Sequence, residues 1–152
     1  MSLARAARSM NDASKRLRKG AGNLDKLVFI SYSREDRDVV ESLSDMLSEF
    51  GYSVWWDREI TAGESVDDRI TAALEAAIAV IVLWSNSSMT STWVQWEANQ
   101  GLKHRKLVPI ALSDLHLRDI RPPFNGLSTL RIGDEAGLIE ALFSLGLREQ
   151  ID

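Results

Sequence analysis

Short apolar runs alternate along this chain with longer stretches in which apolar residues recur every three to four positions. Continuous apolar runs are typical of strands buried on both faces of a parallel sheet, and the longer spacing is typical of amphipathic helices. The pattern predicts five strands, at Leu27–Tyr32, Ser53–Trp56, Ala79–Trp84, Lys106–Ala111 and Thr129–Ile132.

Helices are predicted after the first, second, third and fifth strands. The first carries apolar residues from Val39 to Phe50 and is ended by Gly51. The others extend through Ala77, to about His104, and over Glu135–Leu145. Side-chain caps are predicted from Ser33 with Asp36, from Ser65 with Asp68 and from Thr92 with Gln95. Loops or irregular segments are predicted at Asp57–Glu64, Ser85–Ser91 and Leu115–Leu127.

Strands alternating with helices predict an α/β fold with a five-stranded parallel sheet, doubly wound, and helices on both faces. In such sheets a ligand binds in the crevice beyond the carboxyl ends of the strands. These ends are predicted at Ser31–Arg34, Trp56–Asp57, Trp84–Ser88, Ala111–Asp114 and Ile132–Asp134.

Composition narrows the class of protein. A chain of 152 residues can form one domain with an ordinary core. It has no cysteine, which excludes a disulfide framework, a thiolate metal site and a cysteine nucleophile, and fits a reducing compartment. Residues 1–20 hold six basic residues and one acid, so the rest is more acidic than the net charge of −4 suggests. An acidic body argues against nucleic-acid binding by the folded part.

The basic segment is interpreted as a tail or linker, flexible or weakly helical, over residues 1–24, followed by a domain over residues 25–152. The tail could be a solvated arm, an attachment to an anionic surface, or a leader of the Arg-rich, acid-poor kind. No apolar run approaches the roughly 20 residues that a transmembrane segment needs.

Trp93 and Glu97 are the first candidates for chemistry. They are four residues apart, about one helical turn, so both lie on the same helix face near a predicted strand end. The pair could belong to a nucleotide enzyme. Alternatively, Glu97 could be a surface residue paired with a base, and Trp93 could pack in the core. Trp96 is on a different face and is predicted to be buried.

From about Lys26 to Leu147 the chain resembles a Toll/interleukin-1 receptor (TIR) domain, which has a flavodoxin-like fold. The resemblance is carried by Val28–Ser33, by Asp57–Gly63, by Trp93 and Glu97 as Trp-x-x-x-Glu, and by Val108–Ile110. Each match alone is weak. Four in the right order, on the right elements, are specific.

The resemblance implies one of two functions. Some TIR domains are adaptors that act only by self-association. Others, in bacterial defence, plant immunity and axon degeneration, hydrolyse or cyclise NAD⁺ and release nicotinamide, and there the glutamate matched by Glu97 is catalytic. The loop Asp57–Glu64 has no proline, which receptor-type members often carry there. Together with the presence of Trp93 and Glu97, this favours the enzyme.

The resemblance also implies a set of substrate-binding residues. Ser33 and Arg34 match two positions that contact the nucleotide, and a guanidinium suits a phosphate. Both have plainer interpretations, as a helix cap and a solvated arginine, and Gly63 could be a turn glycine. The candidates are Ser33, Arg34, Asp57, Thr61, Gly63 and Trp93. NAD⁺ is then a substrate, and no cofactor or metal is expected.

Partners follow from the same resemblance. Active members assemble before they turn over, so we expect self-association with other TIR domains. A cytoplasmic location is also expected, in keeping with the absence of cysteine. A fused or partner sensor or oligomerisation module is expected as well.

A single carboxylate suits the cleavage of NAD⁺. Most glycosidases need two, because the leaving alkoxide must be protonated. Nicotinamide instead leaves as a neutral ring from a pyridinium, so no general acid is required. One ionised glutamate, whose ordinary pKa is near 4.3, can stabilise the oxocarbenium-like charge on the ribose.

A response-regulator receiver shares the five-stranded architecture but is disfavoured. Glu35 and Asp36 could supply its acid pair. The third strand, however, is followed by Ser85-Asn86 instead of a phosphorylated aspartate, and the fifth by Gly133-Asp134 instead of a lysine.

Overall fold

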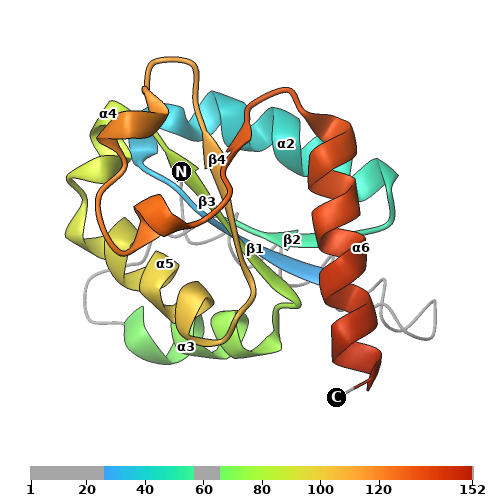
Figure 1. Ribbon diagram of the computed structural model, residues 1–152. Helices are drawn as coiled ribbons and strands as arrows, with labels where there is room; N and C mark the ends of the chain where they lie inside the picture. Colours follow the sequence, from blue (N-terminus) through green and yellow to red (C-terminus); the bar gives the residue numbers. More distant parts are fainter. Residues whose placement is uncertain (1–25, 57–65, 152) are drawn as a thin grey trace.

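The computed structural model describes residues 26–56 and 66–151, which form a parallel α/β sheet with helices on both faces (Figure 1). The strands lie in the order β2-β1-β3-β4-β5 and every neighbouring pair is parallel. Their bounds are β1 Leu27–Ser31, β2 Ser53–Trp55, β3 Ala79–Trp84, β4 Leu107–Ala111 and β5 Leu130–Arg131. The predicted fold class and all five strands are confirmed.

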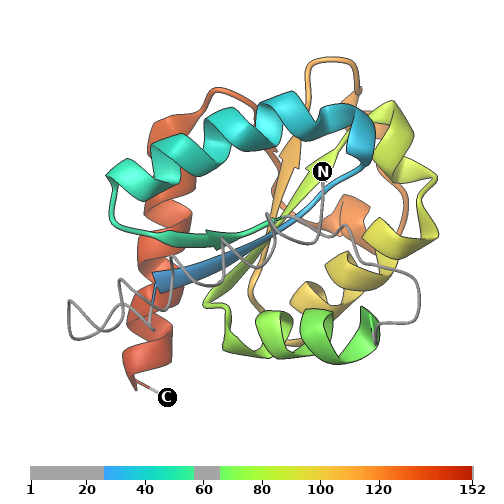
Figure 2. The ribbon, with the colours of Figure 1, turned by 180° about the vertical axis from the view of Figure 1, so that it is seen from behind.

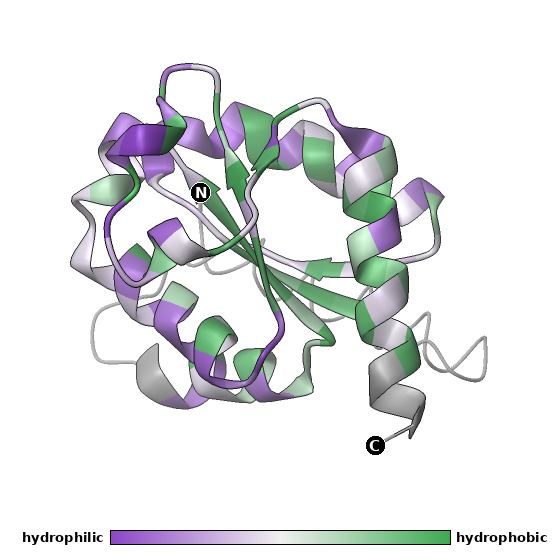
Figure 3. Cartoon of the chain, in the orientation of Figure 1, coloured by the Kyte–Doolittle hydropathy of each residue, from purple (hydrophilic) through white to green (hydrophobic). Residues whose placement is uncertain are grey.

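Strand β3 is the centre of the sheet. Its Val80 is paired with Phe29 of β1 on one side and with Leu107 of β4 on the other. All residues of β1 and β3 are buried. Alternate residues of β1 belong to different core clusters, Val28 and Ile30 to one and Leu27 and Phe29 to another. Burial on both faces explains why these strands read as continuous apolar runs (Figure 3).

Within the described part of the chain, α helices cover both faces of the sheet (Figures 1 and 2). Helices α2 (Arg37–Glu49) and α6 (Glu135–Ile151) share a core cluster with Ile30 and Ile110. Helices α3 (Val66–Ala76), α4 (Asn86–Met89) and α5 (Thr92–Lys103) pack on the opposite side. Gly51, with φ +91°, follows the end of α2 as predicted.

The start of α2 differs from the prediction. Ser33 does not cap a helix: its hydroxyl donates a hydrogen bond to the carboxylate of Glu35. A single 3-10 turn, η2 (Arg34–Asp36), comes first, and α2 begins only at Arg37. The carboxylate of Asp36 accepts a hydrogen bond from Ser85 Oγ at 2.6 Å, so it is engaged by a distant strand end.

The segment Ser85–Ser91 also differs. It was predicted to be a loop, yet it contains α4, whose start is capped by a box in which Ser85 and Ser88 exchange hydrogen bonds. Ser91, not Thr92, caps α5: its Oγ accepts a hydrogen bond from the backbone N–H of Val94 at 3.2 Å. The predicted cap was wrong because the chain enters the helix one residue earlier.

The remaining predicted loops contain short turns or are not described. The segment Leu115–Leu127 holds two 3-10 helices, η3 (Leu117–Asp119) and η4 (Phe124–Gly126). The loop Asp57–Glu64, the cap residue Ser65 and the tail over residues 1–24 lie outside the described residues. Across residues 26–56 and 66–151, no helix combines the length and the apolar character needed to cross a membrane.

Candidate active site

Glu97 lies at the carboxyl end of β1, the edge of the sheet where a ligand site was predicted. Its side chain projects from α5 toward β1 and is fully buried, with 0% exposure. Its Oε1 accepts a hydrogen bond of 2.6 Å from Oγ of Ser31, the last residue of β1. The surface interpretation of Glu97 is therefore wrong. The carboxylate is held at the carboxyl end of a central strand.

Burial makes this carboxylate unusual. Among the described residues, Glu97 is the only Asp, Glu, Lys, Arg or His that is buried; the other buried polar residues are serines. Removing an ionised carboxylate from water costs several kcal/mol, and hydrogen bonds and charge partners offset this only in part. A position that required only packing would be better filled by an apolar side chain, so burial favours a functional interpretation.

Ser31 is a site residue that the sequence did not reveal. It was placed at a strand end, but nothing in the local pattern linked it to Glu97, 66 residues away. A small polar residue closing an otherwise apolar strand was the available signal. Its hydroxyl orients the Glu97 carboxylate because the donor is fixed by the β1 backbone.

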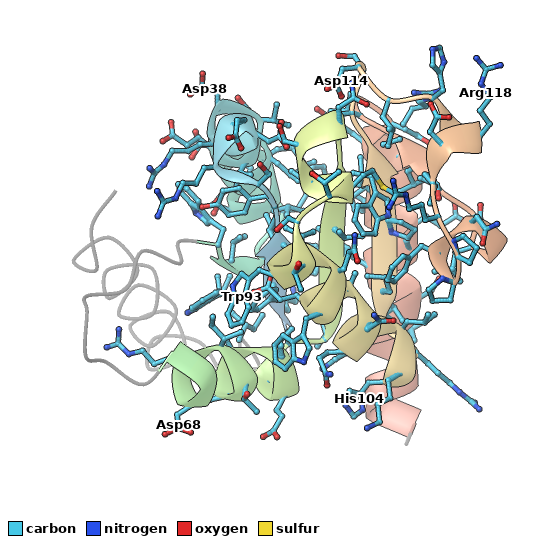
Figure 4. The ribbon with its side chains drawn as sticks, turned by 90° about the vertical axis from the view of Figure 1, so that its left-hand side faces the viewer. Asp38, Asp68, Trp93, His104, Asp114 and Arg118 are labelled. Carbon is cyan, nitrogen blue, oxygen red and sulfur yellow. The ribbon has the colours of Figure 1, made fainter. Side chains whose placement is uncertain are left out.

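Trp93 and Trp96 form a stacked pair on α5. Their ring centroids are 5.6 Å apart and their planes differ by 16°. Trp93 is half-buried and packs against the cluster that contains Leu27 and Phe29. Trp96 is 37% exposed, so the prediction that it is buried was wrong. Figure 4 shows Trp93 on α5, between the start of α2 and α3.

The other predicted substrate-binding residues divide into two groups. Ser33 and Arg34 directly follow the β1 end, two and three residues after Ser31; Ser33 is half-buried and Arg34 exposed. They therefore lie at the same edge of the sheet as Glu97. Asp57, Thr61 and Gly63 lie outside the described residues.

A second polar network joins the ends of β1 and β3 at this edge. Its link is the hydrogen bond from Ser85 Oγ to Asp36. Burial raises the pKa of Asp36 above its usual range, and the charges of Asp114 and Glu35 add to the rise, while the Ser85 hydrogen bond opposes it. The pKa of Glu35 is lowered, chiefly by the hydrogen bond from Ser33. The network ties two strand ends together at the edge of the sheet where Glu97 lies.

Helix α5 is anchored so that Glu97 reaches β1. At its start, Gln95 Nε2 donates a hydrogen bond of 2.6 Å to the carbonyl of Met89 in α4. Near its end, Gly101 lies against β3: a Cβ added there would be 2.9 Å from Cβ of Val80. A side chain at position 101 would push the helix away from the sheet.

A separate cleft lies on the other face of the sheet. Its volume is about 440 Å³, and it lies between α2 and α6, with Leu43, Ile110 and Leu138 in its lining and Asp38 and Arg131 among its charged residues. Glu97 and Ser31 do not line it. Despite its size, this cleft is not the candidate active site, because the buried carboxylate of Glu97 lies on the opposite face of the sheet.

The fold and the buried carboxylate define a doubly wound α/β domain with one buried acidic side chain at the carboxyl ends of its strands. A family model described as the TIR domain matches residues 28–142, and the chain belongs to this family. The resemblance inferred from the sequence motifs is confirmed.

Two curated relatives share this domain. The chain is 27% identical over 146 residues to the probable 2' cyclic ADP-D-ribose synthase TcpO of Methanobrevibacter olleyae, covering 88% of this chain and 42% of that protein. It is 33% identical over 89 residues to the 2' cyclic ADP-D-ribose synthase BtTIR of Bacteroides thetaiotaomicron, covering 54% and 31%. The chain thus spans less than half the length of either relative.

A solved structure shows the same fold. The TIR domain of the Toll-related receptor TRR-2 from Hydra magnipapillata matches with a TM-score of 0.61 and 23% identity, over 82% of this chain and 98% of that one. At this identity the likeness concerns the fold alone.

Proposed function

We propose that this domain cleaves NAD⁺ between nicotinamide and ribose, with Glu97 as the catalytic residue. The observation that carries the proposal is the full burial of the Glu97 carboxylate at the end of β1, hydrogen-bonded to Ser31. The names of two relatives, both 2' cyclic ADP-D-ribose synthases, support a reaction at the nicotinamide–ribose bond.

The proposed chemistry needs one carboxylate. The bond between ribose C1′ and the nicotinamide nitrogen breaks, and its electron pair neutralises the pyridinium. Positive charge develops on the ribose, where the negative charge of Glu97 stabilises it. Water then bonds to C1′ and loses a proton, giving ADP-ribose. If a hydroxyl of the same molecule attacks instead, the product is cyclic.

Other residues take supporting roles in the proposal. Ser31 orients the Glu97 carboxylate. Trp93 confines the nicotinamide or ribose, and Ser33 and Arg34 contact the nucleotide, with Arg34 at a phosphate. Three further substrate contacts are assigned to Asp57, Thr61 and Gly63. The domain is proposed to act in the cytoplasm.

Self-association is part of the proposal. Exposed apolar side chains on α6 support it: Phe143 is 63% exposed and Leu147, one turn later, is 44% exposed. These residues also support the second candidate function, a non-catalytic adaptor that acts only through contacts between TIR domains. A fused or partner module that drives clustering, in immune or antiviral defence signalling, fits either function.

The deciding experiment is incubation with NAD⁺ across a protein concentration series, with free nicotinamide, ADP-ribose and its cyclic form all quantified. The matched control is Glu97→Gln, which keeps the side-chain volume and an acceptor for Ser31 but removes the charge. We expect Glu97→Gln to lower nicotinamide release by about 10²–10³-fold, and wild-type activity to rise faster than linearly with concentration. A folded Glu97→Gln protein with full turnover refutes the catalytic role. No nicotinamide at any concentration, even when clustering is forced, favours the adaptor.

A further inference from the structure

Three side chains on α5 form a row from the interior to solvent. Glu97 is fully buried, Trp93 is half-buried and Trp96 is 37% exposed. With about 100° between successive residues of a helix, Trp93 lies between Trp96 and Glu97 around the helix axis. Trp96 therefore stacks on Trp93 from the side away from the carboxylate.

The position of Trp96 is not explained by core packing. It belongs to none of the three core clusters of the described residues, whereas Trp93 packs against one of them. Trp96 lines a crevice of about 80 Å³ with Leu74 and His104. Ligand pockets usually measure about 300–1,000 Å³, so this crevice is too small to explain an exposed indole. The ring contact that defines its orientation is the stack on Trp93.

We propose that Trp96 is a positioning residue for the dinucleotide, acting through Trp93; this rests on the NAD⁺-cleaving function proposed above. The core cluster holds Trp93 on one side and Trp96 holds it on the other. The plane of the Trp93 ring is thereby restricted, and because Trp93 is only half-buried, part of its surface remains accessible to a ligand.

The charge of the substrate determines which kinetic constant this contact affects. The nicotinamide of NAD⁺ is a cationic pyridinium, which an indole face attracts. The positive charge leaves that ring as the bond to ribose breaks, so the attraction is stronger in the bound substrate than in the transition state. A contact of this kind lowers KM and does not raise kcat. It also weakens once nicotinamide is neutral, which favours product release.

The expected size follows from the strength of an aromatic pair. That strength, equivalent to roughly a 2- to 12-fold change in an equilibrium constant, sets the upper limit of the effect on affinity, because the stack is present with and without NAD⁺. Trp96→Ala should therefore raise KM for NAD⁺ by about 3- to 10-fold and leave kcat within about 2-fold. Trp96→Phe keeps an aromatic face against Trp93 and should restore KM to within about 3-fold of wild type.

The test measures kcat and KM for wild type, Trp96→Ala and Trp96→Phe. Phe50→Ala is the matched control, because Phe50 is an exposed aromatic at the end of a different helix, α2, and has no part in the proposed site or in self-association. The dissociation constant for NAD⁺ is also measured by calorimetry in the Glu97→Gln background, with and without Trp96→Ala. This measurement does not need turnover. Far-ultraviolet circular dichroism reports the coupling between the two stacked indoles, which both Trp96 variants should lose.

The outcomes separate this inference from the function on which it rests. A raised KM and dissociation constant in Trp96→Ala, with recovery in Trp96→Phe and no change in Phe50→Ala, support the positioning role. A lowered melting temperature with unchanged KM shows that Trp96 only stabilises the fold, and overturns it. A fall in kcat at constant KM overturns it as well. Absence of nicotinamide release by wild type refutes the proposed function, and unchanged NAD⁺ affinity in Trp96→Ala separately refutes positioning.

Discussion

Replacing Ser31 by alanine removes the hydroxyl that donates to the Glu97 carboxylate. The hydrogen bond is 2.6 Å long, both residues have 0% exposure, and water cannot take the place of the lost donor without entering the core. A hydrogen bond to a charged group contributes about 1.5–3 kcal/mol, compared with about 0.5–1.5 kcal/mol between neutral groups. The Ser31→Ala variant should therefore be destabilised by about 1.5–3 kcal/mol.

The same substitution should cost less when position 97 is uncharged. In the Glu97→Gln background, Ser31→Ala removes a neutral hydrogen bond, so we expect a loss of only about 0.5–1.5 kcal/mol. The difference between the two losses of stability measures how much the charge of Glu97 strengthens its hydrogen bond with Ser31. For a chain of this size, 1 kcal/mol changes the melting temperature by roughly 2–4 °C.

The assay is urea denaturation of four proteins: wild type, the two single variants and the double variant. Nicotinamide release by Ser31→Ala is measured in parallel and should fall, because the carboxylate loses its fixed donor. Equal losses of stability in the two backgrounds, or no loss from Ser31→Ala in either, would show that Ser31 and Glu97 do not form a charge-assisted hydrogen bond.

Two further predictions concern the frame of the site. Gly101→Ala should lower the free energy of unfolding by about 1–3 kcal/mol through overpacking against Val80. The control is Gly146→Ala, which adds a methyl group to a helix in open space and should leave the free energy of unfolding unchanged or raise it by up to about 1 kcal/mol. Equal denaturation midpoints for the two variants would contradict the close approach of α5 to β3. Asp36 has a raised pKa in the folded state, chiefly because of burial. The native protein therefore binds more protons than the unfolded chain, and stability falls as pH rises from the ordinary aspartate pKa through the raised value. Asp36→Asn should abolish that fall in a series of denaturation curves across this range, and an unchanged pH profile would show that Asp36 does not cause it.

The elements that were predicted well have strong local signals. Strands β1 and β3 are buried on both faces, so almost every residue in them is apolar. The end of α2 was predicted from the glycine at position 51. Gly51 adopts a positive φ there, which glycine tolerates more readily than other residues. The helix starts were less predictable. Several hydroxyls lie near each start, and tertiary contacts, such as that between Ser85 and Asp36, decide which of them caps.

The sequence by itself determined the α/β class, the five strands and the placement of Trp93 and Glu97 one turn apart, because these depend on periodicity within short segments. Only the tertiary structure decided that Glu97 is buried rather than exposed, that its donor is Ser31, and that Trp96 is exposed and stacked on Trp93. Helical spacing shows which residues share a face, but the depth of that face depends on how closely α5 packs against the sheet. That distance is set at Gly101 and by residues on other elements, far away in the chain.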